Sequence, residues 1–376
     1  MQDWPSASSS SSVVNKYIFL GLAIMIVSEA ATVAGIEPFA SWNTPIAWTG
    51  FIIFADAVVY GARGDSWMRS SPREFAALCL VSIPLWLVFE SFNLVLRNWH
   101  YVGLPENVVL RTVGYAWSFA TIWPAIFEGA ELISVWRTGQ AGWERLRPRF
   151  AAAKQSRGAL REPQGDLSLS KVEASASVRA GGGAPAPVQK RRAGQAGWAG
   201  RAGQVTAERV LASQITHPAD PAHPADPAHP AHPADPAHRG LAVSTIGALM
   251  LASPFLVAPA VARYLAAPVW LGFVLLLDPI NAVRGEESLQ RDWRAGQFNR
   301  TINLVLSGFL CGGLWELWNY WAHAKWHYTV PIMENLKVFE MPLPGYLGFP
   351  PFALECFTMY VFLRSLIGRS GRPIAL

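Results

Sequence analysis

The sequence is poor in charge and in cysteine. Only 15% of its 376 residues are Asp, Glu, Lys or Arg, against about 25% in an average soluble domain. The three cysteines, Cys79, Cys311 and Cys356, lie within apolar stretches and form no CxxC or Cys/His zinc pattern. A disulfide framework is therefore not expected. The sequence also lacks a nucleotide-binding loop, a Gly-x-Ser-x-Gly motif and the ExxH or HExxH patterns of metal-binding helices,.

The sequence instead contains long apolar segments. Hydrophobic residues make up 51% of the chain, and a helix needs about 20 mainly apolar residues to cross a bilayer. Eight segments approach this length: 14–36, 46–62, 75–97, 108–136, 241–262, 266–283, 301–323 and 346–368. The sequence thus predicts an all-α integral membrane protein with about eight transmembrane helices. The net charge of +5 fits contact with anionic membrane lipids better than contact with nucleic acid,.

A polar segment, 138–240, separates the first four of these helices from the last four. It begins with an Arg-rich stretch, which we expect to continue the preceding helix, and it ends in a His-Pro-Ala-Asp-Pro-Ala repeat. Proline repeats without an apolar face do not offset the entropy of folding, so a disordered linker is predicted. The predicted organisation is a four-helix repeat at 1–137, the linker at 138–240 and a second four-helix repeat at 241–376.

The distribution of arginine predicts the orientation in the membrane. Arginines are concentrated in segments 63–74 and 284–300, in the linker and in the tail after residue 363. Basic connecting segments remain on the cytoplasmic side. We therefore predict a multi-pass protein of the inner (plasma) membrane, with both termini and the linker in the cytoplasm.

The two halves of the chain share residues at a nearly constant spacing of 221 to 227 positions. The matches include Asp56/Asp278, Glu90/Glu316, Asn93/Asn319, Trp99-His100-Tyr101/Trp326-His327-Tyr328, Pro124/Pro351 and Glu128/Glu355. Because each half has an even number of predicted helices, both halves enter the membrane from the same side. The repeats are therefore expected to be parallel, related by an axis near the membrane normal, with equivalent residues facing one another.

Six of the matched residues are carboxylic acids in apolar segments, and these are the candidate catalytic residues: Glu90, Glu316, Glu128, Glu355, Asp56 and Asp278. Acids within a membrane usually face the interior of the helix bundle and mark proton relays or ion pathways. The structural alternative is a set of interhelical hydrogen bonds or ion pairs, for example with Arg63 or Arg284. Three matched pairs favour a functional cavity.

The candidate ligand-binding residues lie close to these acids. Asn93 and Asn319 follow Glu90 and Glu316 by three positions, and His323 follows Glu316 by seven, which places each set on one helix face,. The Trp-His-Tyr motifs add Trp99, His100, Tyr101, Trp326, His327 and Tyr328. Aromatic faces can bind an apolar or cationic ligand; a belt of aromatic residues at the membrane interface is the alternative.

Neither a metal nor a cofactor is assigned, because no ligand motif accompanies these residues. The two matched prolines carry separate predictions. Pro124 is expected to kink its helix, whereas Pro351 is expected to begin the last one.

The stretch FEMPLPGYLGFPPFALECFTMY, residues 339–360, resembles uncharacterised multi-pass membrane proteins of bacteria and archaea. The general plan is similar to that of the heterodimeric-type lycopene cyclases and the carotenoid hydratases, in which a Trp/Tyr-bearing loop precedes a proline and acidic residues. The matching positions here are Trp99, Tyr101, Pro124, Glu128, Trp326, Tyr328, Pro351 and Glu355. The PxEE motif of the cyclases is absent. The resemblance implies an isoprenoid-like substrate.

Three functions remain open at this point. The first is an intramembrane enzyme that transfers protons to and from a lipophilic substrate. The second is a proton-coupled transporter of a small molecule, and the third is a non-catalytic membrane scaffold or assembly protein. A compact core of acids and aromatic residues favours the enzyme. The expected partners are membrane lipids and a lipophilic small molecule, and no nucleic acid.

Overall fold

The computed structural model describes residues 7–159, 236–368 and 371–375, with side chains from 14 to 139 and from 239 onward. It is mostly helical (76%), as predicted. Residues 1–152 and 233–376 form one compact unit; of a second unit, 153–232, only the end of one helix is described. The Arg-rich stretch continues the preceding helix as far as Ala159, as expected. Residues 160–235 lie outside the described residues. The disordered linker therefore stays a prediction.

The elements of the first half are followed by a similar order of elements in the second. The first half contains α1 (Ala7–Val33), α2 (Phe39–Arg63), α3 (Trp67–Ser70), α4 (Pro72–Leu96), β1 (Trp99–Val102) and α5 (Val108–Ala159). The second contains α6 (Pro236–Ala252), η3 (Ser253–Phe255), α7 (Pro259–Ala262), α8 (Ala266–Val283), α9 (Leu289–Arg294), α10 (Asn299–Trp321), β2 (Lys325–Tyr328), β3 (Lys337–Val338), β4 (Met341–Pro342), η4 (Leu343–Gly348) and α11 (Phe349–Leu366). An insertion with β3, β4 and η4 precedes α11.

Five helices of the described chain are long and apolar enough to cross a membrane: Val14–Val33, Phe39–Arg63, Pro72–Leu96, Ala266–Val283 and Leu343–Leu366. Arg239–Phe255 is apolar but shorter. The predicted spans 108–136 and 301–323 form α5 and α10 but are not among the five. Both helices contain acids that are buried by packing against other helices. Eight transmembrane helices remain a prediction.

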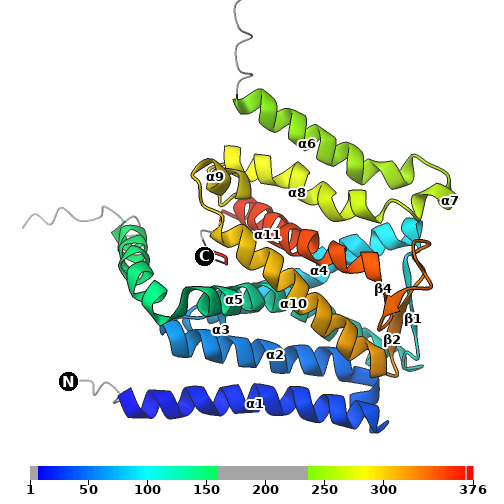
Figure 1. Cartoon of the computed structure of the whole chain (residues 1–376), viewed down its shortest axis with the longest axis horizontal. Helices are drawn as coiled ribbons and strands as arrows, with labels where there is room; N and C mark the ends of the chain where they lie inside the picture. The colour runs from blue at the N-terminus through cyan, green and yellow to red at the C-terminus, as the bar shows by residue number, and fades with distance from the viewer. Residues whose placement is uncertain (1–6, 160–235, 369–370, 376) are drawn as a thin grey trace, which may run out of the picture. The chain divides into compact units, whose positions relative to one another are not determined.

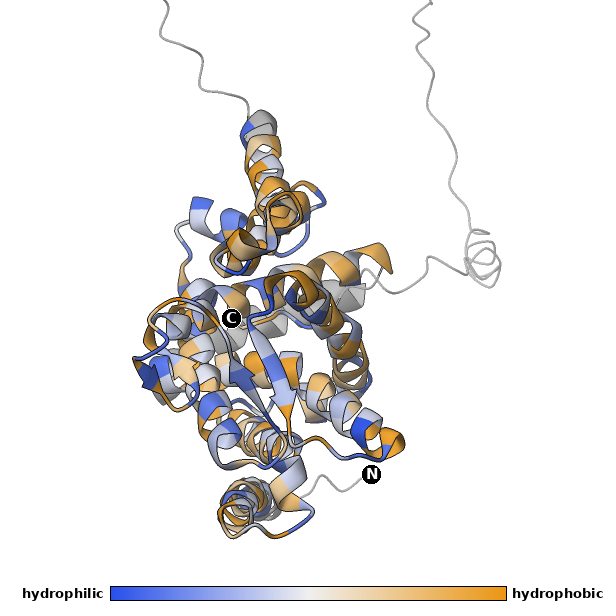
Figure 2. Cartoon of the chain, turned by 90° about the vertical axis from the view of Figure 1, so that its right-hand side faces the viewer, coloured by the Kyte–Doolittle hydropathy of each residue, from blue (hydrophilic) through white to orange (hydrophobic). Residues whose placement is uncertain are grey.

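Several helices expose apolar side chains. Phe19 of α1, Leu94 of α4 and Leu241 of α6 are 68%, 78% and 68% exposed. In Figure 2 the colour of hydrophobic residues covers much of the ribbon of the helices. Large exposed apolar surfaces are rare on soluble monomers. The helices are therefore compatible with a multi-pass membrane protein.

Within the compact unit, two helix pairs lie on opposite sides of a central group. α1 packs along α2, and α6 packs along α8. Figure 1 shows α4, α5, α10 and α11 between these pairs. Aromatic contacts connect the halves: Trp48 of α2 meets Trp318 of α10 with ring centroids 4.6 Å apart, and Phe89 of α4 stacks on Trp270 of α8 at 5.3 Å. A helix of each half thus packs against a helix of the other.

The two Trp-His-Tyr motifs form a short antiparallel sheet. β1 pairs with β2 so that Trp99 lies opposite Tyr328, His100 opposite His327 and Tyr101 opposite Trp326. An aromatic belt at helix ends was the alternative considered from the sequence, and strands were not predicted. Four residues are too few to reveal a two-residue period, and the pairing partner is more than 200 residues away,.

Two helix ends also differ from expectation. α10 ends at Trp321, and Ala322 has extended backbone angles (φ −63°, ψ 143°), so His323 does not share the helix face of Glu316. Within the described part of α5, only Gly139 departs from helical angles, so the helix continues through Pro124 and the kink expected there stays a prediction. Pro351 does lie in the first turn of α11, as predicted.

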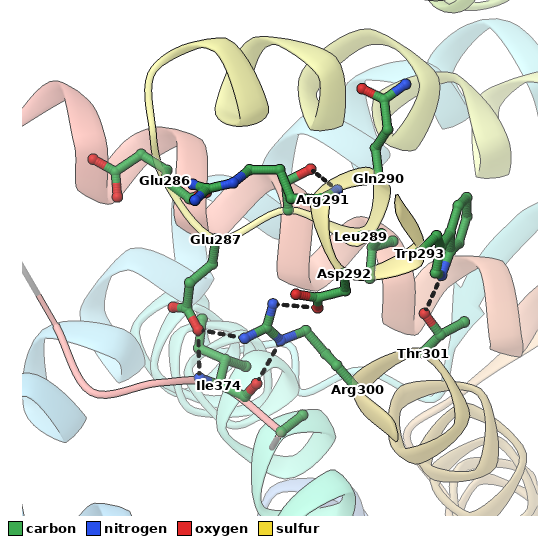
Figure 3. A network of polar contacts seen from close by, with 12 residues as sticks. Glu286, Glu287, Leu289, Gln290, Arg291, Asp292, Trp293, Arg300, Thr301 and Ile374 are labelled. Atoms are coloured by element: carbon green, nitrogen blue, oxygen red, sulfur yellow. Dashed lines mark hydrogen bonds and ion pairs between the residues drawn. The ribbon is translucent and has the colours of Figure 1, made fainter. Parts of the chain in front are cut away.

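The C-terminal segment 371–375 inserts into the interior of the compact unit. Ile374 and Ala375 are fully buried. Arg300, at the start of α10, donates from Nε to the Ile374 carbonyl at 3.0 Å and forms ion pairs with Asp292 at 2.6 Å and Glu287 at 2.7 Å (Figure 3). The tail is therefore part of the packed core.

Candidate functional site

An aromatic cavity of about 130 Å³ lies beside the paired strands. Twelve of its 25 lining residues are aromatic, and these come from α2, α4, α5, α8, α10, α11 and both strands. The wall includes Trp42, Trp48, Trp86, Trp99, Tyr101, Tyr115, Phe119, Trp270, Trp315, Trp326, Tyr328 and Phe352. The structure therefore brings together four of the residues singled out in the sequence, the Trp and Tyr of each Trp-His-Tyr motif.

Behind the tyrosine of each Trp-His-Tyr motif lies one of the predicted acids. Tyr328 donates its hydroxyl to Glu316 Oε1 at 2.7 Å, and Tyr101 donates to Glu90 Oε1 at 2.5 Å. Burial raises the pKa of both tyrosine hydroxyls, and the adjacent glutamate raises each pKa further,. Both hydroxyls thus remain protonated at neutral pH. Each is positioned between a carboxyl group and the cavity.

The two Tyr–Glu pairs differ in their other hydrogen bonds. Glu90 Oε1 also accepts from Trp86 Nε1 at 2.8 Å and from Trp99 Nε1 at 3.4 Å. Among the described residues, Glu316 Oε2 has no hydrogen-bond partner, and Glu316 is fully buried. The indole of the second half, Trp326, instead donates to the Tyr328 oxygen at 2.8 Å. Glu90 therefore has the larger number of donors around its carboxyl group.

Asn93 and Asn319 connect these helices to the strands. Asn319 is fully buried; its Nδ2 donates to the Trp326 carbonyl at 2.9 Å, and its Oδ1 accepts from the Trp326 amide at 3.0 Å. Asn93 makes the same two contacts with Trp99, at 2.9 and 3.2 Å. Neither amide lines the cavity. Both position the strands that carry the tyrosines.

Asp56 of α2 and Asp278 of α8 accept hydrogen bonds from the first turns of the short helices α3 and α9. Asp278 accepts hydrogen bonds from the Leu289 and Gln290 amides at 2.7 and 2.9 Å. Asp56 accepts from the Met68 amide at 2.9 Å and pairs with Arg69 at 2.6 Å. Carboxylates stabilise helix N-termini through these amides. The structure places both acids outside the aromatic cavity.

Glu128 and Glu355 are fully buried and also lie outside the cavity. Glu355 Oε1 accepts from the Phe273 amide at 3.3 Å. Neither oxygen of Glu128 has a hydrogen-bond partner among the described residues. The arginine suggested as a structural partner for these acids, Arg63, pairs with Glu131. The structure thus brings Glu90 and Glu316 close to the cavity and keeps the other four acids apart from it.

The two motif histidines belong to a separate polar cluster. Their ring centroids are 5.9 Å apart, and His327 Nδ1 lies 2.9 Å from Glu340 Oε2. Lys325 Nζ lies 2.8 Å from the other Glu340 oxygen. Burial opposes ionisation of Glu340, but hydrogen bonds and charge from Lys325 and His327 lower its pKa overall. No group of three or more His, Cys, Asp or Glu suited to a metal occurs among the described residues.

Several wall residues were missed by reasoning from the sequence. Trp48 and Trp270 are separated by the same 222 positions as Asp56 and Asp278, and both line the cavity. That shared spacing was the signal that could have identified them. Phe352 and Tyr115 had no comparable signal, because an aromatic residue in an apolar helix is usually a packing residue.

Comparison with protein-family models, with curated proteins and with solved structures finds no match. The function is therefore inferred from the geometry of the cavity.

Proposed function

We propose that this chain is a multi-pass membrane enzyme that binds a lipophilic, isoprenoid-like substrate in the aromatic cavity and transfers protons through the two Tyr–Glu pairs. One observation carries the proposal: Tyr101 and Tyr328 line the same cavity, and each is hydrogen-bonded to a glutamate, Tyr101 to the partly buried Glu90 and Tyr328 to the fully buried Glu316. Diagonal neighbours in an antiparallel sheet are about 7–8 Å apart, so both hydroxyls can reach one ligand.

The chemistry follows from the position of each hydroxyl. Tyr328 gives its proton to a carbon–carbon double bond of the substrate and takes one from Glu316. The adjacent carbon becomes a cation, which the indole faces of the wall stabilise. Tyr101 accepts a proton from the neighbouring carbon while it passes its own to Glu90. For the substrate, the net reaction shifts a double bond or closes a ring, with no oxidation or reduction. Glu316 has then lost a proton and Glu90 has gained one, and proton exchange with solvent restores both before the next turnover.

The hydrogen-bond pattern supports this assignment of acid and base. Donors to a carboxylate stabilise its charged form, and three of them meet at Glu90 Oε1. Glu316 has one donor on Oε1, and its Oε2 has no partner among the described residues. This difference in donors is the basis for assigning Glu90 as the group that receives the proton and Glu316 as the group that supplies it. General acid–base catalysis requires such a difference between two groups.

The proposal includes the duplicated architecture. Matched Glu–Tyr and Asn–strand contacts in the two halves support two parallel four-helix repeats that arose from one unit. We further propose that the protein crosses the inner membrane with eight helices and that its linker and both termini lie in the cytoplasm. The weak likeness to carotenoid-modifying membrane enzymes, which rests on the Trp/Tyr loop and the following Pro and Glu, agrees with this substrate class.

The test compares lipid and pigment extracts of a strain lacking the gene after it receives the wild-type or a variant chain. Glu316→Gln and Tyr328→Phe are each expected to lower product by a factor of 100 or more, since general acid–base groups contribute about 10²–10⁴-fold. Tyr320→Phe is the matched control. Tyr320 lies near the end of α10, the helix that contains Glu316, and its side chain is partly exposed. Unchanged extracts from both variants, at normal protein level, would refute the enzyme. Vesicle uptake of an unmodified compound would indicate the transporter.

A further inference from the structure

A second cavity shares part of its wall with the aromatic cavity. Its volume is about 380 Å³, and the two cavities have four lining residues in common: Trp99, Trp270, Tyr328 and Met341. Cavities that bind drug-sized ligands usually measure about 300–1,000 Å³. The aromatic cavity, at about 130 Å³, is smaller than this. A lipid-sized molecule that reaches the tyrosines must therefore extend beyond it, and the second cavity adjoins the same side chains.

The aromatic cavity also has an unbalanced positive charge. Two cations line it, Arg111 and Lys325, and none of its lining residues is acidic. Lys325 is paired with Glu340 at 2.8 Å. Arg111 is partly buried, and its side chain makes no hydrogen bond or ion pair with the described part of the chain. The wall therefore contains a guanidinium group that has no ion-pair partner among the described residues.

The position of Arg111 adds to this charge. It lies in the first turn of α5, where the helix dipole places further positive potential and where acidic rather than basic residues are stabilising,. Arg111, Tyr115 and Ser118 follow one another at helical spacing and all line the cavity,. A ligand with an anionic group would supply the missing charge, and guanidinium groups bind carboxylates and phosphates in a planar, two-bond arrangement.

We propose that the ligand is a long-chain amphiphile with an anionic head, a carboxylate or a phosphate, bound at Arg111, and with an apolar chain that extends past the shared wall into the second cavity. The inference rests on the proposed function, because it names the ligand of the same cavity. The cation of the second cavity, Arg263, is less suited to the head group. Its Nη2 already donates to the Thr329 carbonyl at 3.1 Å.

The first experiment measures tryptophan quenching in the purified full-length chain in detergent micelles. The probes are dibromostearic acid and the neutral dibromostearyl alcohol, which share one chain. The acid is expected to bind about tenfold more tightly than the alcohol, the effect of one hydrogen-bonded charge. Arg111→Gln should remove this preference. Lys337→Gln, which removes an exposed cation outside both cavities, should keep it. Competition by dodecanoate or by monododecyl phosphate identifies the head group.

The second experiment tests where the chain lies. Gly348 lines the second cavity, and a side chain added there meets open space. Gly348→Phe is expected to fill this space and to abolish binding of the C18 acid while a C8 acid still binds. Equal effects on both chain lengths would exclude the second cavity from the site.

The outcomes separate the inference from the proposed function. Equal affinity of the unaltered protein for acid and alcohol would overturn the anionic head, whether or not any variant folds, and would leave the lipophilic cavity in place. If Arg263→Gln lost the preference for the acid and Arg111→Gln kept it, the head group would bind at Arg263, and the assignment to Arg111 would be overturned. Absence of quenching by either probe would overturn the lipophilic site itself.

Discussion

Replacing Arg300 with alanine is expected to release the C-terminal segment from the interior. The guanidinium is only 5% exposed and joins three chain segments, through Asp292, Glu287 and the Ile374 carbonyl (Figure 3). Arginine suits this position because its planar group donates in several fixed directions at once. Alanine removes all of these bonds and leaves the space of the side chain empty.

The magnitude follows from which groups lose their partners. Glu287 keeps Arg364 at 2.6 Å, so it is not left alone. Asp292 and the Ile374 carbonyl lose the bonds from Arg300. Removal of one partner from a buried ion pair costs about 3–5 kcal/mol of folding stability. The lost hydrogen bond to the Ile374 carbonyl is not added to this range. One kcal/mol shifts the midpoint of thermal unfolding by about 2–4 °C in chains of 150–250 residues and by less in longer ones, so for this chain of 376 residues the midpoint should fall by roughly 10 °C or less.

The assay is thermal unfolding of the purified chain in detergent, followed by tryptophan fluorescence. Arg291→Ala is the matched control, because this exposed arginine lies nearby and its Nη1 donates to the Glu286 carbonyl at 2.8 Å (Figure 3). An exposed change of this kind is expected to alter stability by no more than about 0.5 kcal/mol. Carboxypeptidase should digest the Arg300→Ala tail faster than the control tail. Equal midpoints for the two variants would refute the reasoning.

Asn319→Leu is expected to destabilise the protein by about 2–5 kcal/mol, because the buried amide and carbonyl of Trp326 both lose their partner,; an unfolding midpoint like that of the wild type would contradict this. Gly308→Leu should prevent folding, since an added Cβ would lie 2.6 Å from a main-chain oxygen at the start of α11, whereas Gly313→Leu meets open space and should remain monodisperse in size-exclusion chromatography. Glu340 has a folded pKa below its ordinary 4.5, so its contribution to stability is present above pH 4.5 and is lost as the pH falls through the lower folded value. A Glu340→Gln variant should lack that acid dependence in fluorescence titration.

Most helices could be predicted from the sequence, because apolar runs of membrane length are a local property of the chain. Five predicted spans correspond to helices long and apolar enough to cross a membrane. α5 and α10 are less apolar, since they contain acids such as Glu128 and Glu316. Average hydropathy does not distinguish a polar side chain that faces lipid from one that faces a neighbouring helix. Only packing shows that both acids are fully buried.

The candidate site could be predicted in part. The Trp and Tyr of the two motifs do meet in one cavity, and their duplication was the signal. Asn319 was expected to bind a ligand, but its amide bonds to the Trp326 backbone instead. A spacing of three residues places two side chains on one helix face, but it does not tell whether a side chain turns toward a ligand or toward a returning strand.

The sequence by itself determined the helical class, the positions of most helices and the pairs of matched residues, because these depend on composition and on short, regular spacings. Only the tertiary structure decided that the two Trp-His-Tyr motifs pair with each other, that a tyrosine lies between each glutamate and the cavity, and that the tail enters the core. Those features depend on contacts between residues far apart in the chain. Such contacts are selected by the packing of the whole unit, and no local pattern encodes them.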